Sequence, residues 1–489
     1  MSNKLVLVTA LLMLPLFLSD CARNPVTGKK QVSFMSAAQE QALGDESDPQ
    51  IVAAYGLYED AEMQAFINKK GQQMGLVSHK PDLKYTFKIL DSPVVNAFAL
   101  PGGYVYFTRG IMAHFNNEAE FAGVLGHEIG HITARHSAQQ YTKQVLGQIG
   151  LAAGLVVSPT FRQFAEQANQ GLSLMFLKFG RDDESESDQL GVEYSTKIGY
   201  DAHEMADFFK TLGRLQAQAG ASIPNFLSTH PNPTDRFGKV HEAADEWQTS
   251  YPQAKKVNSE AYLRLIDGMV FGDDPKQGFV ENNIFYHPEL KFEFPVPQNW
   301  TLQNSPAMVN ISPADGKALI QFTVSQEKTR KAAADKLVQD AKLKVIERQD
   351  NAQVNGLPAS VMLTEQTPTN ESGQATGNPI RILSYFIDYG SLIYVFHGMA
   401  GQSDFNSYSS TFKQTMTKFK ELTDATKLNK KPKTIKIVKV QQGGPLKNVV
   451  QSFGAKQADI ETIAILNGVE LNSNIATGTR IKVINDPNS

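Results

Sequence analysis

The chain has 489 residues, of which 41% are hydrophobic and 20% are charged, and its formal net charge is −3. This length exceeds one typical domain, so we expect two to four domains. The balanced charge argues against a nucleic-acid-binding protein, and no apolar run is long enough to predict a permanent membrane span.

The first twenty residues are typical of an export signal. Residues 5–18, LVLVTALLMLPLFL, have the length of a signal-peptide core. The only cysteine, Cys21, follows closely, and residues 18–21 (LSDC) resemble a lipobox in which Asp20 replaces the usual small residue. We expect a lipoprotein-type signal over residues 1–20, a lipid on Cys21 and a periplasmic location at the outer membrane. Plain periplasmic secretion is the alternative.

Residues 21–35 are polar and turn-rich, and they predict a tether. The following segment, residues 36–255, is mainly helical in pattern, with strand-like stretches at 84–91 (KYTFKILD) and within 96–112 (NAFALPGGYVYFTRGIM). Residues 145–159 are apolar and glycine-rich but too short to span a bilayer. They favour a buried or surface-lying helix over a membrane contact.

One stretch of this segment, VLGHEIGHITARH at residues 124–136, concentrates three histidines and a glutamate. A helix is predicted here, because apolar residues recur at helical spacing after a capping box formed by Asn117 and Glu120. His127 and His131 are four residues apart, so both imidazoles face the same side and reach one Zn²⁺ at about 2.0–2.1 Å. Glu128 lies where a carboxylate accepts a proton from an activated water.

The alternative is an ordinary buried helix with incidental histidines. That reading leaves Gly126 and Gly130 unexplained, since a glycine inside a helix costs about 1 kcal/mol relative to alanine. The third histidine, His136, lies nine residues after the first, which on a continuous helix is the opposite face. We therefore expect His136 to have a structural role.

A third metal ligand is needed downstream. The acidic run at residues 181–188 (RDDESESD) places Glu184 and Asp188 four residues apart, although alone it is typical of a solvated surface. Together with HExxH it resembles the gluzincin zinc metallopeptidases of the HtpX, BepA and CaaX-prenyl-protease family, in which an ExxxD motif follows an arginine such as Arg181. The resemblance implies that His127, His131 and Glu184 hold one Zn²⁺. It also implies that Asp188 orients a ligand histidine.

Two further stretches resemble the same family. Residues 229–236 (THPNPTDR) match its HP-x-x-x-x-R element, which implies that His230 approaches the metal as a latent fourth ligand or as an oxyanion donor. Arg236 would be a nearby charge partner, and an ordinary turn histidine is the alternative for His230. Residues 96–112 resemble the segment that supplies an edge strand for substrate pairing.

The rest of the chain changes character. Residues 260–422 predict an α+β domain, with a half-buried strand at 290–296 and a hairpin turning at 388–391. Helices are predicted at 331–343 and 405–420, and the domain resembles the PsbP/Mog1 sheet-and-helix sandwich. After a lysine-rich linker, residues 434–486 resemble a LysM module with the order strand, helix, helix, strand. Gly444 and Pro445 depart from the usual Asp-Thr of that family.

These observations predict an α+β protein with a mainly helical zincin-like domain, a sheet-and-helix sandwich domain and a small LysM-like module. The function that they favour is zinc endopeptidase activity on cell-envelope proteins, implied by the resemblance to be protein quality control, with Glu128 as general base. The expected partners are protein substrates, the outer membrane through the lipid anchor, and peptidoglycan through residues 434–486. The alternative is a wall-associated chaperone or binding protein whose zinc site is latent or structural.

Overall fold

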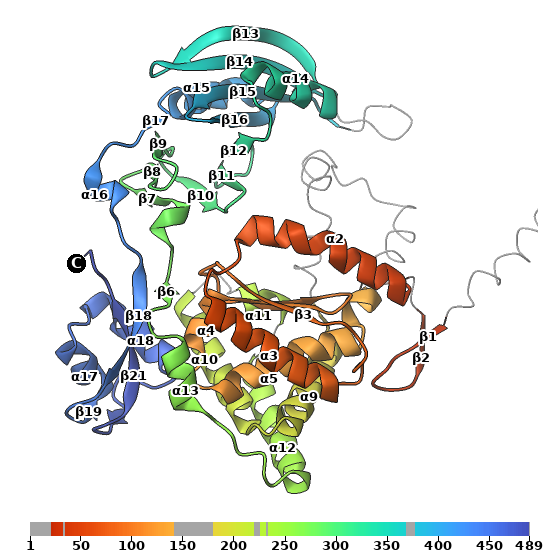
Figure 1. Ribbon diagram of the computed structural model, residues 1–489. Coiled ribbons are helices and arrows are strands. Elements are labelled where there is room, and N and C mark those ends of the chain that lie inside the picture. The colour runs from red at the N-terminus through yellow and green to blue at the C-terminus, as the bar shows by residue number, and fades with distance from the viewer. Residues whose placement is uncertain are drawn as a thin grey trace, which may run out of the picture.

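The computed structural model describes residues 21–32, 35–140, 179–219, 225–230, 233–367 and 377–488. The predicted signal at residues 1–20 and the apolar stretch at 145–159 lie outside the described residues. Among the described residues, no helix is long and apolar enough to cross a membrane. The fold mixes helices and sheets, and Figure 1 shows a helical N-terminal domain, a β-rich middle domain above it and a small C-terminal module at its side.

The N-terminal domain packs helices around a small sheet and one central helix. Its strands are β3 (Thr86–Leu90), β4 (Ala97–Leu100) and β5 (Tyr104–Thr108), in the order β3-β5-β4, so that β4 lies at an edge. Its helices are α2 (Ala37–Tyr55), α3 (Ala61–Val77), α4 (Arg109–His114), α5 (Glu118–Thr133), α9 (Arg181–Lys197), α10 (His203–Ala219), α11 (Asn225–Thr229), α12 (Pro233–Ser250) and α13 (Ser259–Leu265). Every residue of α5 is buried, which makes it the centre of the domain.

Residues 21–32 form a hairpin of β1 (Cys21–Arg23) and β2 (Lys30–Val32), where the sequence indicated only a tether. Asn24 organises its turn, because the side-chain oxygen accepts hydrogen bonds from the backbone N–H groups of Val26 and Thr27. The Asn24 side-chain amide also donates to the carbonyl of Ala134 at 3.2 Å. The hairpin is thereby attached to the C-terminal end of α5.

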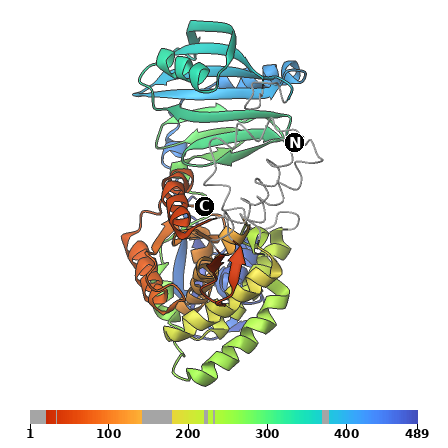
Figure 2. The ribbon, with the colours of Figure 1, turned by 90° about the vertical axis from the view of Figure 1, so that its right-hand side faces the viewer.

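In its described residues the middle domain contains two sheets together with the helices α14 (Arg330–Asp340) and α15 (Phe405–Met416). Figure 2 shows its strands above the helical N-terminal domain. The four-stranded sheet, in the order β17-β9-β8-β7, consists of β7 (Phe279–Glu281), β8 (Ile284–His287), β9 (Phe292–Pro295) and β17 (Lys420–Glu421). The seven-stranded sheet consists of β10 (Trp300–Asn304), β11 (Met308–Pro313), β12 (Ala318–Ser325), β16 (Leu392–Gly401), β15 (Ile380–Tyr389), β14 (Leu357–Gln366) and β13 (Lys344–Val354), in that order.

Several local predictions for this domain are confirmed. The predicted strand at 290–296 is β9, and the predicted helices are α14 and α15. The predicted hairpin is formed by β15 and β16, which pair up to Tyr389 and Leu392. Its two-residue turn includes Gly390 with a φ of 61°, a left-handed value that glycine adopts without strain.

The C-terminal module has the order β18 (Lys433–Lys439), α17 (Leu446–Ser452), α18 (Ile460–Leu466) and β21 (Arg480–Asn485). Strand β18 pairs with β21 and also with β6 (Val270–Phe271), which follows α13. Residues of α13 and of the segment up to Met269 belong to the core of the N-terminal domain. The segment from α13 to Met269 therefore packs with the N-terminal domain.

Candidate metal centre

Helix α5 begins with a side-chain cap close to the predicted one. The side-chain oxygen of Asn117 accepts a hydrogen bond from the backbone N–H of Glu120 at 2.8 Å. The Glu120 carboxylate accepts from the backbone N–H of Asn116 at 2.6 Å, one residue before the position a capping box uses. The cap starts α5 so that His127, Glu128 and His131 lie in its second half, all buried.

Glycines set the distance between α5 and α9. A Cβ on Gly126 would lie 2.9 Å from the Cα of Gly191, and one on Gly191 would lie 2.9 Å from the carbonyl oxygen of Gly123. A Cβ on Gly130 would lie 3.2 Å from the Cα of Ser187. The two helices thus pack backbone against backbone. This close packing explains why glycine rather than alanine occupies these positions of a buried helix. It also brings the acidic face of α9 next to the histidines of α5.

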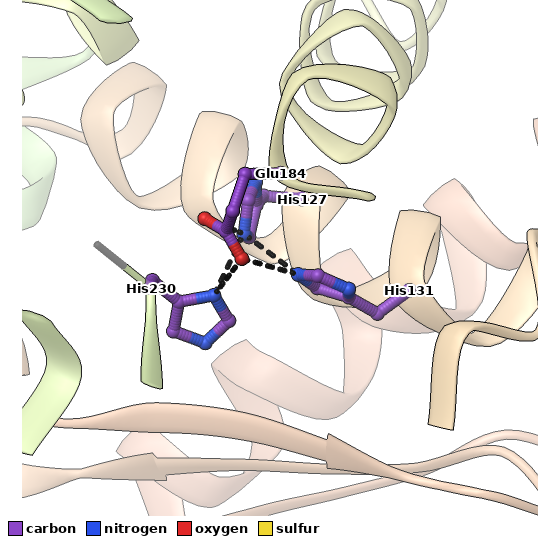
Figure 3. A group of neighbouring side chains, drawn as sticks. All are labelled: His127, His131, Glu184 and His230. Carbon is purple, nitrogen blue, oxygen red and sulfur yellow. Dashed lines mark hydrogen bonds and ion pairs between the residues drawn. The ribbon is translucent and has the colours of Figure 1, made fainter. Parts of the chain in front are cut away.

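Four buried side chains converge from three elements (Figure 3): His127 and His131 of α5, Glu184 of α9 and His230, which follows α11. The Nε2 atom of His127 lies 3.0 Å from Nε2 of His131 and 3.2 Å from Nδ1 of His230. The Oε1 atom of Glu184 lies 2.9 Å from Nδ1 of His230 and 3.5 Å from Nε2 of His131. Figure 3 shows the Glu184 carboxylate facing all three imidazoles.

These separations fit a tetrahedral metal ion. Ligand atoms at 2.0–2.1 Å from zinc in tetrahedral geometry are about 3.3 Å from one another, which is close to the distances found here. Burial lowers the pKa of His131 well below its usual value, so this imidazole is neutral, which is the form that binds a metal. The residues present therefore fit Zn²⁺.

Glu128 lies beside this group without joining it. Its side chain is fully buried, and neither carboxylate oxygen has a hydrogen-bond partner among the described residues. Its Oε1 atom lies 3.7 Å from Nε2 of His230. Burial raises the pKa of Glu128, because a carboxylate that lacks hydrogen-bond donors is poorly stabilised in a nonpolar environment. A buried carboxylate without a hydrogen bond is costly to maintain and indicates a chemical use.

Asp188 and Arg236 contact the candidate ligands His127 and Glu184. The Oδ1 atom of Asp188 lies 2.9 Å from Nδ1 of His127, which leaves Nε2 of that histidine for the metal. The Arg236 guanidinium donates to both oxygens of Asp188, and its Nη1 atom forms an ion pair with Glu184 at 2.9 Å. Asp188 and Arg236 therefore lie next to the candidate ligands, where the resemblance had placed them. Arg181 begins α9 and lines a cavity of about 220 Å³ with Glu184, Asp188 and Arg236.

His136 lies nearer the site than a continuous helix allows. Helix α5 ends at Thr133, and Arg135 adopts a φ of 62°, so the chain turns back before residue 136. The Nδ1 atom of His136 lies 2.9 Å from Nδ1 of His131, and its Nε2 atom lies 3.0 Å from a Glu186 oxygen. His136 is not one of the four converging residues, as expected. The prediction that it lies on the helix face opposite His127 is wrong. It contacts the outer nitrogen of a candidate ligand.

Comparison with known proteins gives a family for this region. Residues 58–244 match the profile described as Peptidase family M48. The chain is 28% identical over 259 residues to the "Beta-barrel assembly-enhancing protease" of Escherichia coli (strain K12), over 51% of this chain and 52% of that protein. It is 28% identical over 244 residues to the "Mitochondrial metalloendopeptidase OMA1" of Schizosaccharomyces pombe, over 49% of this chain and 69% of that protein.

The similarity to these relatives covers only part of each chain. This chain spans about half the length of the Escherichia coli relative. Among solved structures, the cyanobacterial PsbP of Synechocystis sp. PCC 6803 matches 28% of this chain and 91% of its own, with 13% identity and a TM-score of 0.23.

Proposed function

We propose that the whole protein is a zinc-dependent endopeptidase acting on proteins of the bacterial cell envelope, because residues 58–244 match the profile of Peptidase family M48 and contain the candidate metal centre. The observation that carries the proposal is a buried Glu128 carboxylate that has no hydrogen-bond partner within the described part of the chain, beside four converging ligand side chains. A purely structural zinc site has no use for such a carboxylate, whereas hydrolysis needs a proton acceptor there.

The proposed roles follow from the geometry. His127, His131 and Glu184 would hold the zinc ion, which when bound polarises a water molecule and the carbonyl of the scissile peptide bond. Glu128 would accept the proton of the attacking water and deliver it to the leaving amine, and its raised pKa makes it a stronger base for the first of these transfers. Asp188 keeps the Nδ1–H of His127 occupied, so the Nε2 lone pair points to the metal.

His230 supports a second state of the same protein. Its Nδ1 atom is close enough to His127 and Glu184 to complete a four-ligand site. A zinc ion with four protein ligands has no open position for substrate, so this arrangement favours a latent form. We propose that His230 is the fourth ligand at rest and leaves during activation, when its imidazole becomes available to donate to the developing oxyanion. If His230 never leaves, the chain would act only as a binding protein or chaperone.

The location and substrates are proposed from the sequence and the relatives. The name of the Escherichia coli relative refers to β-barrel assembly, which supports envelope proteins as substrates and a role in protein quality control. Edge strand β4 offers backbone groups to which an extended substrate could pair. A lipid on Cys21 would hold the peptidase domain close to the outer membrane, because Asn24 ties this hairpin to α5. The LysM-like residues 434–486 would bind peptidoglycan.

The central test compares wild type with Glu128→Gln. The variant keeps the size of the side chain but is a far weaker base, so we expect full zinc content and casein degradation slowed by about 10²–10⁴-fold. The matched control is Glu193→Gln on α9, a carboxylate paired with Lys197, which should keep full activity. Unchanged degradation by zinc-loaded Glu128→Gln would refute the proposed mechanism.

Latency and anchoring have separate tests. His230→Ala should retain zinc and change the rate, upward if release from the fourth position limits turnover and downward if oxyanion donation matters more. A variant that is unchanged in both zinc content and rate excludes both roles.

For the anchor, Cys21→Ser should move the protein from the membrane fraction to the soluble periplasmic fraction. Continued membrane association would contradict lipidation.

A further inference from the structure

A second group of histidines and carboxylates lies on the surface of the N-terminal domain, between α10 and α12. His203 is the first residue of α10, and His241 and Asp245 lie one turn apart on α12. Each of the three can place one ligand atom within 4.8 Å of the others. The group shares no residue with the candidate metal centre, and its side chains are partly or largely exposed.

The distances within this group suit a common ion. The Nε2 atom of His203 lies 3.0 Å from Oδ1 of Asp245, and Nδ1 of His241 lies 3.4 Å from Oδ2 of the same carboxylate. The two imidazole rings are 4.7 Å apart between centroids. The two nitrogen–oxygen separations lie on either side of the value of about 3.3 Å between ligands of tetrahedral zinc.

Asp201 prepares His203 for metal binding. Its Oδ1 atom lies 2.6 Å from Nδ1 of His203, and the same oxygen accepts the backbone N–H of His203 at 3.1 Å. A carboxylate on one imidazole nitrogen fixes the tautomer and directs the lone pair of the other nitrogen outward, an arrangement common at metal-ligating histidines. Here the outward nitrogen is Nε2, the atom that faces Asp245.

We propose that His203, His241 and Asp245 form a second site for a divalent transition-metal ion of the zinc class. Two imidazoles and one carboxylate are ligands that such ions prefer, and water from solvent would complete the coordination. The charges of Asp245 and Asp201 together balance a 2+ ion. The ion would join α10 to α12, the helix that also carries Arg236. By joining the two helices, the bound ion would stabilise the packing of α12, whose Arg236 contacts Glu184 and Asp188.

A simpler arrangement is a protonated His203 between two aspartates. Partial burial by itself lowers the pKa of His203, but hydrogen bonds to Asp201 and Asp245 outweigh it and raise the pKa. This arrangement accounts for His203 but gives His241 no role beyond its contacts with Asp245, His203 and Phe237. The two interpretations differ in a measurable quantity, the number of zinc ions bound per chain.

The test uses full-length protein without a histidine tag, dialysed against a slight excess of ZnCl₂ and analysed for bound metal. We expect His241→Ala to bind one zinc fewer per chain than wild type, and Asp245→Asn to bind zinc at this site at least tenfold more weakly. Asp207→Asn, an exposed carboxylate of α10 paired with Lys210, is the control and should bind as wild type does. Added zinc should also raise the Tm of wild type more than that of His241→Ala.

The difference between wild type and His241→Ala counts only the second site. It therefore holds whether or not the four-residue centre binds zinc or hydrolyses peptides. Equal zinc content and equal zinc-dependent Tm shifts in the two proteins would overturn the proposal and leave the protonated His203 as the explanation.

Discussion

Asp188 is the residue on which the geometry of the candidate centre most depends. Its carboxylate contacts Nδ1 of His127 and both the Nε and Nη2 atoms of Arg236. Burial by itself raises the pKa of Asp188, but the Arg236 guanidinium and His127 lower it below its usual value, so the side chain is ionised. An ionised acceptor raises the basicity of His127 and fixes its orientation.

Asp188→Asn should therefore weaken metal binding without unfolding the domain. The amide keeps the size of the side chain but removes the charge, and loss of such an outer contact costs about 10–100-fold in metal affinity. Competition with a chromogenic chelator measures the zinc Kd, and circular dichroism checks the fold. Asp182→Asn, an exposed neighbour on the first turn of α9, should bind zinc as wild type does. Equal Kd values for Asp188→Asn and wild type would exclude the orienting role.

At this scale helical spacing places His127 and His131 on one face of a helix. Glu184 and His230, which lie beside them in the structure, were expected only from the resemblance to the metallopeptidase family. His136 was placed incorrectly because nothing in the sequence marks Arg135 as a left-handed turn, a conformation usually taken by glycine or asparagine. The turn is stabilised from a distance, since Arg135 bonds the Glu40 carboxylate and the carbonyl of Met35. Such contacts require the fold.

At the scale of elements, the crossing of α5 and α9 determines whether Glu184 reaches the histidines. Gly126→Ala tests this directly. The new methyl group would lie 2.9 Å from the Cα and carbonyl oxygen of Gly191, so the two helices must separate. We expect a loss of about 1–3 kcal/mol in the free energy of unfolding, which is typical of overpacking, together with reduced zinc content.

Gly213→Ala is the matched control for this prediction. Gly213 lies within α10, and a Cβ there meets no atom of the described residues within 4 Å. The substitution should therefore raise the free energy of unfolding by about 0.5–1 kcal/mol through helix propensity, with zinc content unchanged. Thermal melts and metal analysis of both variants give the comparison. If the two alanines had the same effect, the glycines of α5 would not set the helix distance.

The central strand of the middle domain makes its stability depend on pH. His397 of β16 is buried and lies 2.9 Å from the hydroxyl of Ser384, and burial lowers its pKa to about 4. An unfolded histidine has a pKa of about 6.5, so between these values the unfolded state binds more protons than the folded state. Acidification from pH 7 to 5 should therefore cost about 2 kcal/mol at this residue.

His397→Gln should show a smaller loss over the same pH range, because glutamine does not titrate but can still bond Ser384. The unfolding of the middle domain can be followed by the fluorescence of Trp300 in a Trp247→Phe background, since these are the only two tryptophans. Urea titrations at pH 7 and pH 5 give the two free energies for each protein. An identical pH dependence in the two proteins would show that His397 does not control it.

For the whole molecule, the C-terminal module is attached to the N-terminal domain rather than held only by a linker. Arg214 of α10 donates to the carbonyl of Val469 and forms an ion pair with Glu461 of α18. Strand β6 pairs with β18, and Ile435 belongs to the core of the N-terminal domain. The order strand, helix, helix, strand within the module was expected from its resemblance to a LysM module. The attachment could not, since it depends on residues about 250 positions apart.

Lys482 of β21 is fully buried in this attachment and gives the last prediction. Its side chain donates to the carbonyls of Ala113 and Phe115 at 3.0 and 2.9 Å, at the C-terminal end of α4, and burial lowers its pKa to about 7. Lys482→Met preserves the length of the side chain but leaves both carbonyls without this donor, at a cost of about 1–3 kcal/mol. We expect the module to detach more often and proteases to cleave the linker at residues 423–433 faster than in wild type.

Lys447→Met, on the exposed side of α17, is the control and should be cleaved at the wild-type rate. Equal cleavage of Lys482→Met and wild type would mean that β6 and Arg214 hold the module without the lysine.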